Sequence, residues 1–206
     1  MRRSPAAGVG ALAFGVLTIV GLIVENAPGG NYSAKDVADY VRSGHRPLVF
    51  LGVYLGALGI VGLVFLLARL RDAIADGSRA RVFWGLGLSA TGTIGAGYSL
   101  TAAVPIAMGY GGKDVTLAPT VTFVFSESGW VIMTVGFIVL GCSLLTFALG
   151  SVAVPAWVRW STVVAGVAAF ASAAWFPLAL VIIWAVATGI WLLARGGAPE
   201  PAPSPA

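Results

Sequence analysis

The stretch "WVRWSTVVAGVAAFASAAWFPLALVIIWAVATGIWLLAR", residues 157–195, decides the fold of this chain. It is an apolar run of about 39 residues. As a single α-helix it would be about 58 Å long, nearly twice the ~30 Å thickness of bilayer hydrocarbon. A tight hairpin at "AAWFP" resolves the mismatch, because Pro177 can stand in the first turn of a new helix, where its missing N–H costs nothing. The run therefore predicts two antiparallel membrane helices.

The composition of the whole chain agrees with a membrane location. Of its 206 residues, 58% are hydrophobic and 10% are charged, and the mean hydropathy is +0.94. Soluble domains carry about 25% charged residues, so a water-soluble globule is excluded. The net charge of +4 comes from arginines at the edges of apolar segments, and we expect no nucleic-acid partner. With a single cysteine, Cys142, and a single histidine, His45, we expect no metal site and no cofactor.

The apolar segments predict an all-α, polytopic transmembrane bundle in one domain. Six spans fit best, at about 8–25, 47–68, 82–105, 128–149, 156–175 and 177–195, with five spans as the alternative. The first is read as a retained helix, because Glu25 would occupy position −3 of a signal-peptide cleavage site. Eight of the lysines and arginines fall on one side of the six spans and four on the other, which places both termini in the cytoplasm of a bacterial cell. Residues 196–206 are expected to be disordered.

The loop after the first span contains a predicted surface helix, at about 34–43. Ser33 can cap it, and Asp36 in its first turn interacts favourably with the helix dipole. Val37, Tyr40 and Val41 give it one apolar face, and a glycine at position 44 ends it. We expect this helix to lie on the membrane surface or to cover the bundle.

Small residues on the predicted spans indicate where helices pack against each other, because they let backbones approach closely. In the third span they recur at strict i,i+4 spacing: Gly85, Ser89, Thr93, Gly97 and Thr101. In the second span they include one GxxxG pattern: Gly52, Gly56 and Gly59.

Two glutamates extend such small faces to the outer ends of their spans. In the first span the face comprises Ala11, Gly15, Thr18 and Glu25, and in the fourth it comprises Glu127, Thr134, Gly141 and Ala148. Both glutamates are therefore predicted to face the bundle interior on the same side of the membrane. The alternative is that both are solvated at the interface. If both glutamates face the bundle interior, they line a polar pocket that opens toward the outer side of the membrane. Its candidate residues are Glu25, Glu127, His45, Arg46, Tyr98, Phe125 and Trp130.

The segment "SAKDVADYVRSGHRPLVFLGVYLGALGIVGLVFLLARLRDA", residues 33–73, together with the late hairpin, resembles in layout a group of small actinobacterial multi-pass membrane proteins of unknown function. This resemblance implies a fold and no activity. A small helical bundle with inward carboxylates is also similar to integral-membrane terpene cyclases, which are thought to protonate a prenyl chain with a buried acid; that likeness is an analogy of fold.

No catalytic motif is present, and three functions remain open. The first is binding of a membrane lipid, a small hydrophobic ligand or a partner protein in the outward pocket, without catalysis. The second is an acid-initiated prenyl cyclase, with Glu127 or Glu25 as proton donor and the rings of Trp130, Tyr98 and Phe125 stabilising a cation. The third, a proton-coupled transporter, is disfavoured because the middle of each span lacks ionisable residues. The oligomeric state is left open.

Overall fold

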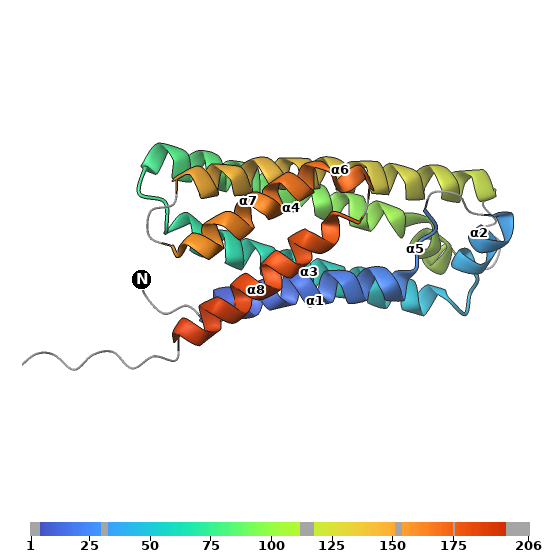
Figure 1. The fold of residues 1–206 in the computed structure, drawn as a ribbon. Coiled ribbons are helices and arrows are strands. Elements are labelled where there is room, and N and C mark those ends of the chain that lie inside the picture. The colour runs from blue at the N-terminus through green and yellow to red at the C-terminus, as the bar shows by residue number, and fades with distance from the viewer. Residues whose placement is uncertain (1–4, 30–32, 112–117, 151–153, 175, 197–206) are drawn as a thin grey trace, which may run out of the picture.

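The computed structural model describes residues 5–29, 33–111, 118–150, 154–174 and 176–196, and these are all-α. The described chain contains eight α-helices and no strand (Figure 1). They are α1 (Pro5–Glu25), α2 (Ala34–Val41), α3 (Arg46–Arg71), α4 (Gly77–Thr101), α5 (Ala103–Tyr110), α6 (Pro119–Gly150), α7 (Ala156–Phe170) and α8 (Leu178–Gly196).

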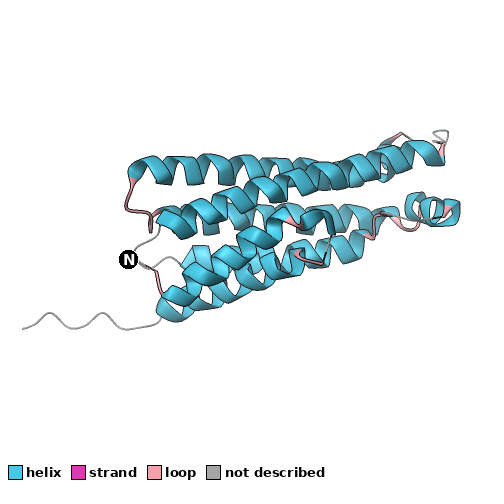
Figure 2. Cartoon of the chain, turned by 45° about the horizontal axis from the view of Figure 1, so that its top comes forward, coloured by secondary structure: helices cyan, strands magenta, loops and turns pink. Residues whose placement is uncertain are grey.

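The helices form an elongated bundle. α1 packs along α3, and α4 packs along α6; α7 lies on α6, and α8 lies on α1. The short helices α2 and α5 cover one end, whereas α1 begins and α8 ends at the other (Figure 1). Short loops join most of these helices (Figure 2). The end covered by α2 and α5 is called the capped end below.

Three helices, α1, α3 and α6, are long and apolar enough to cross a membrane. α7 and α8 are shorter apolar helices. Many large apolar side chains on these helices point away from the bundle; Ile23, Leu149 and Ile183 are 71%, 71% and 61% exposed. Exposed apolar surface on all sides of a bundle is expected where lipid rather than water is the solvent.

The long apolar run at 157–195 is broken at the predicted place. α7 ends at Phe170, a 3-10 turn covers Ser172–Ala174, and Pro177 stands immediately before the first residue of α8. At this apex the Ser172 hydroxyl donates to the Thr134 carbonyl oxygen of α6 at 3.4 Å. Thr134 lies roughly 24 Å along the helix from Gly150, so the hairpin extends over most of a hydrocarbon thickness.

The glycines of α3 pack against α1 as predicted. A Cβ atom at Gly52 would lie 2.7 Å from the Glu25 backbone nitrogen, and one at Gly59 would lie 2.6 Å from the Thr18 Oγ1 atom. A Cβ atom at Gly56 would overlap the ring of Tyr98. Because these distances are shorter than van der Waals contact, neither α1 nor the Tyr98 ring of α4 could approach α3 this closely with any larger residue at those positions.

The predicted packing stripe of α4 is wrong in its first half. Gly97 and Thr101 are buried, but Gly85 and Ser89 are exposed and a Cβ atom at Gly85 would meet open space. A strict four-residue step turns by about 400°, so the stripe moves about 40° around the helix at each step. The buried face instead alternates steps of three and four residues and includes Phe83, Gly87, Ala90, Ile94 and Gly97.

Several predicted boundaries also differ. The third span was expected to reach residue 105, but α4 ends at Thr101 and α5 continues separately, because Pro105 cannot donate a backbone hydrogen bond to the Thr101 carbonyl. The fourth begins at Pro119 rather than at 128, and α2 ends at Val41, three residues before Gly44. Of the predicted disordered tail, residue 196 still belongs to α8 and the remainder lies outside the described residues.

Candidate functional site

The Glu25 carboxyl group is fully buried at the capped end of the bundle. Its Oε1 atom accepts hydrogen bonds from the Thr101 hydroxyl at 2.7 Å and the Tyr40 hydroxyl at 3.1 Å. Its Oε2 atom has no hydrogen-bond partner among the described residues. Among the residues that the structure describes, no cationic side chain lies within ion-pair distance of the carboxyl group. The carboxyl group of Glu25 on α1 thus holds hydrogen bonds from both α2 and α4.

A proline explains why Tyr40 is held here. In a continuing helix the Thr101 carbonyl would accept from the N–H of residue 105, but that residue is proline. The Tyr40 hydroxyl takes the vacant position and donates to the Thr101 carbonyl oxygen at 3.0 Å. Burial, with a smaller contribution from the neighbouring Glu25, raises the pKa of Tyr40 far above its usual range, so the phenol keeps its proton.

The hydrogen-bond cluster can hold its protons in two ways. The Thr101 hydroxyl lies 2.7 Å from both the Glu25 Oε1 atom and the Tyr98 carbonyl oxygen, and Tyr40 also reaches two acceptors. With a carboxylate at Glu25, both hydroxyls can donate to Oε1. With a carboxylic acid, both can turn to the backbone carbonyls, and the acid proton can be donated to a hydroxyl oxygen. Both arrangements fit the same heavy-atom positions.

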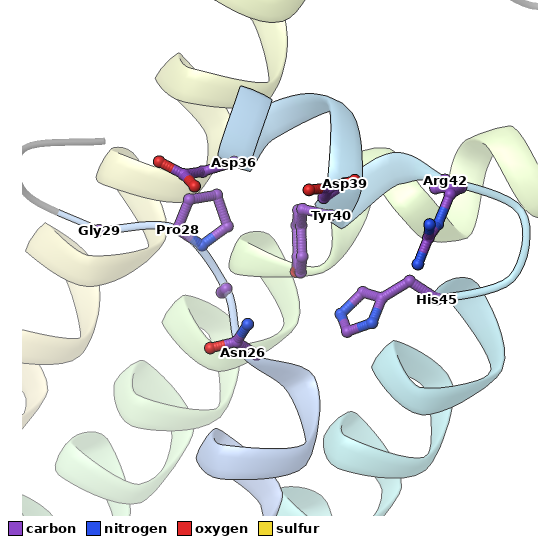
Figure 3. Close-up of a pocket in the computed structure, with 9 residues that line it drawn as sticks. Asn26, Pro28, Gly29, Asp36, Asp39, Tyr40, Arg42 and His45 are labelled. Carbon is purple, nitrogen blue, oxygen red and sulfur yellow. The ribbon is translucent and has the colours of Figure 1, made fainter. Parts of the chain in front are cut away.

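A pocket of about 540 Å³ lies above this cluster, between α2 and the ends of α1 and α3. Figure 3 shows the side chains around it. Its lining is mostly polar and comes from the turn after α1, from α2 and from the residues preceding α3: Asn26, Ala27, Pro28, Gly29, Asp36, Asp39, Tyr40, Arg42 and His45. Tyr40 belongs both to the pocket wall and to the Glu25 cluster, so it connects the two.

Local sequence explains how the pocket wall is held. The Ser33 side chain accepts from the Asp36 N–H at 3.3 Å, and the Asp36 carboxylate accepts from the Ser33 N–H at 2.7 Å, which forms the predicted cap of α2 as a capping box. The hydrogen bond from the Ser33 backbone lowers the pKa of Asp36. On the opposite wall Asn26, with a φ of 49°, ends α1 in the left-handed conformation that asparagine tolerates better than most residues.

Two charged groups on the pocket rim have no side-chain partner among the described residues. The Asp39 carboxylate and the Arg42 guanidinium lie about one helical turn apart, yet they form no ion pair with each other. Both are exposed. The pocket therefore presents a negative and a positive group that are both available to a ligand.

The structure brings three of the sequence-predicted residues together. The His45 Nε2 atom lies 3.1 Å from the Glu25 carbonyl oxygen, and its ring lies beside Tyr40 with centroids 5.8 Å apart. Tyr98 is 1% exposed and donates to the Gly52 carbonyl oxygen at 3.4 Å, where Gly52 itself contacts Glu25.

The other four predicted residues do not join this cluster. Arg46 is tied to backbone, donating to the Val41 carbonyl at 3.0 Å and the Met108 carbonyl at 2.9 Å, which joins α2 and α5 to the start of α3. Phe125 is 40% exposed. Trp130 donates to the Pro28 carbonyl oxygen at 3.4 Å. Glu127 is half-buried on α6, whereas the carboxyl hydrogen bonds of Glu25 go to α2 and α4.

The predicted inward face of α6 is buried at Gly141 and Ala148, as expected, but Thr134 and Glu127 are only half-buried. Ser126, next to Glu127, is the fully buried residue at this level, and its hydroxyl donates to the Pro28 carbonyl oxygen. One residue corresponds to about 100° of rotation around a helix, enough to move Glu127 to the edge of the buried face.

Sequence reasoning missed every residue of the pocket lining except His45, including Asp39, Tyr40 and Arg42, and it missed Thr101 of the Glu25 cluster. Tyr40 was assigned to the apolar face of the surface helix and Thr101 to a packing stripe, and both positions are buried. The signal that could have found the contact between them is Pro105, since it frees a carbonyl in the last turn of α4.

Among the described residues, no three His, Cys, Asp or Glu side chains are grouped so that they could hold a metal ion. Comparisons with protein-family models, with curated proteins and with solved structures found no match. The functional argument therefore depends on the geometry of the pocket and of the Glu25 cluster.

Proposed function

We propose that this chain is a six-span protein of the bacterial plasma membrane that binds a small ligand or a lipid headgroup in the pocket at its capped end. Both termini would lie in the cytoplasm, and the pocket would face outward. The layout would be that of the small actinobacterial membrane proteins which the sequence resembles.

The distribution of charge supports this topology. Five arginines stand in or next to the loops at the end opposite α2: Arg69, Arg71, Arg79, Arg81 and Arg159. An excess of arginine marks the cytoplasmic side of membrane proteins. α4 packs against α6 along its length, and the α7–α8 hairpin lies against α6 and α1, which supports counting these three as the remaining spans.

The observation that carries the binding proposal is the position of Tyr40 between the pocket and the fully buried Glu25. A buried carboxyl group with one unpartnered oxygen and no cation costs stability. Apolar packing alone would not require such a group. A ligand that displaces Tyr40 or shifts α2 would alter the hydrogen bonds of Glu25 directly. Ligand binding in the pocket would therefore change hydrogen bonds inside the bundle.

The mostly polar lining favours a polar ligand or a headgroup over a wholly apolar molecule. Asn26 directly follows α1 and His45 directly precedes α3, so the pocket lies at the ends of two candidate spans, which supports a position at the edge of the hydrocarbon. This depth corresponds to the headgroup region. The prenyl cyclase and the proton-coupled transporter stay predictions.

Mass spectrometry of the molecules that co-purify with the gently extracted protein tests the proposal. A bound ligand should be retained by the parent and by Arg81→Gln, a charge change at the opposite end, and lost from Tyr40→Ala, which opens the pocket wall. Asp39→Asn and Arg42→Gln change only rim charges and keep the assay informative if Tyr40→Ala does not fold. If the parent and all pocket variants retain the same molecules in the same amounts, the pocket is not a binding site.

A further inference from the structure

Positive and negative groups are arranged at separate places around the pocket. Figure 3 shows Asp36 on the side of Pro28 and Gly29, while Arg42 extends toward His45 on the other side, with Asp39 and Tyr40 between them. Asp36 is committed to the cap of α2, which leaves Asp39 as the carboxylate available to a ligand. Asp39 and Arg42 are separated by about one turn of helix, roughly 5 Å along its axis.

The His45 ring adds a second group on the side of Arg42. Its Nε2 atom is placed to donate to the Glu25 carbonyl oxygen, which leaves Nδ1 as the ring atom that is not held by α1. An Nδ1 atom without a proton accepts rather than donates, so the group that a ligand anion would meet on this side is the Arg42 guanidinium. The opposite part of the ligand would meet the Asp39 carboxylate.

We propose that the pocket recognises a zwitterion, a primary ammonium joined by a short linker to a phosphate or carboxylate, and that its source is the headgroup of phosphatidylethanolamine. This inference rests on the proposed function of the pocket. The ammonium binds Asp39, and the anion binds Arg42.

Three features favour a zwitterion over a simple anion or cation. Asp39 would repel an anionic ligand, and Arg42 would repel a cationic one. The two groups do not neutralise each other by pairing, although they lie about one turn apart. A ligand with both charges satisfies both groups at once, and guanidinium with phosphate forms a directional, charge-assisted contact. The lipid source follows from the depth of the pocket at the ends of α1 and α3.

Lipid retention by the full-length protein tests this assignment. The purified protein is equilibrated with equal amounts of phosphatidylethanolamine, phosphatidylcholine and phosphatidylglycerol that have identical acyl chains, and bound lipids are counted by native mass spectrometry. Phosphatidylcholine has a quaternary ammonium that cannot donate a hydrogen bond to Asp39, and phosphatidylglycerol has no ammonium. We expect phosphatidylethanolamine to be preferred over both by about tenfold, the effect of one charge-assisted hydrogen bond.

The variants separate the two ends of the ligand. Asp39→Asn should lower retention of phosphatidylethanolamine to the level of phosphatidylglycerol, while Arg42→Gln should weaken both lipids. Asp72→Asn and Arg81→Gln make the same charge changes at the opposite end and should leave the preference unchanged. Equal retention of phosphatidylethanolamine and phosphatidylglycerol by the parent, or an Asp39→Asn variant with the parent's preference, overturns the inference.

Further outcomes identify the source and separate this inference from the proposed function. Glycerophosphoethanolamine, the headgroup without chains, should displace the lipid at high concentration. Displacement by free glycine at lower concentrations than by glycerophosphoethanolamine would overturn the lipid source and assign a soluble zwitterion. A lipid without an ammonium that is retained at least as well as phosphatidylethanolamine, and that depends on Arg42 but not on Asp39, would refute the zwitterion and leave the binding pocket standing. Retention unaffected by every pocket variant would remove both.

Discussion

Tyr40→Phe tests whether the hydroxyl of Tyr40 holds α2 on the bundle. α2 has eight residues, and only Val37 and Tyr40 are buried. The substitution removes one oxygen atom and keeps the ring, so apolar packing at this site changes little. It leaves the Thr101 carbonyl oxygen without the donor that replaces the missing N–H of Pro105, and the Glu25 Oε1 atom with the Thr101 hydroxyl alone.

The expected cost follows from these contacts. A buried polar group deprived of its partner costs about 1–3 kcal/mol, and the lower half of that range applies here because Thr101 still donates to Glu25. Each 1.4 kcal/mol changes an equilibrium about tenfold. An isolated helix of eight residues is not stable in water, so α2 should lose its structure whenever it leaves the bundle. Tyr40→Phe should therefore raise the open population of α2 about tenfold.

Amide hydrogen exchange of the protein in lipid nanodiscs measures this population. The α2 amides should exchange about tenfold faster in Tyr40→Phe, while the amides of α1 and α3 keep their protection. Tyr54→Phe, at a position that is 72% exposed on α3, is the matched control and should change neither region. Unchanged exchange of α2, or the same acceleration across the whole bundle, would refute the role assigned to the hydroxyl.

Three further predictions follow from the packing, the cap and the topology. Gly62→Ala should lower the free energy of unfolding by about 1–3 kcal/mol, because its Cβ atom would overlap the Gly10 carbonyl oxygen. Gly85→Ala, with open space around the added Cβ atom, is the control and should be neutral or slightly stabilising in the same thermal unfolding assay. The lowered pKa of Asp36 means that its carboxylate stabilises α2 above the ordinary aspartate range and that this contribution is lost as the pH falls through the lowered pKa. After correction for intrinsic rates, α2 should exchange faster in acid, and Asp36→Asn, which cannot titrate at this position, should abolish that dependence. In a Cys142→Ala background, a membrane-impermeant maleimide should label Gly44→Cys from outside and Gly77→Cys only after permeabilisation; labelling of both from the same side would contradict the topology.

The parts of the fold that could be predicted depend on local pattern. The α1 face was predicted because Ala11, Gly15, Thr18 and Glu25 repeat with the helical period, and all four are buried. The hairpin at Pro177 followed from the length of hydrocarbon. The α4 stripe failed because strict i,i+4 spacing drifts around a helix, and over sixteen residues the drift of about 160° separates Gly85 from Thr101.

The site could be predicted only in part, because its decisive contacts join residues that are distant in sequence. Glu25 was a candidate since it ends a small face, but its partners Tyr40 and Thr101 are 15 and 76 residues away. The pairing of Glu25 with Glu127 relied only on the spacing of small residues along α6. A shift of the buried face by one residue is enough to put Ser126 rather than Glu127 in the buried position. Pro105 predicts the position of the site better than either glutamate does. It frees the Thr101 carbonyl oxygen at the end of α4, and the Tyr40 hydroxyl that binds this oxygen holds α2 over Glu25. Pro105→Ala, which restores the backbone donor, should therefore weaken the attachment of α2 even though Pro105 does not line the pocket. Hydrogen exchange of α2 as slow as in the parent would show that the proline does not set the site.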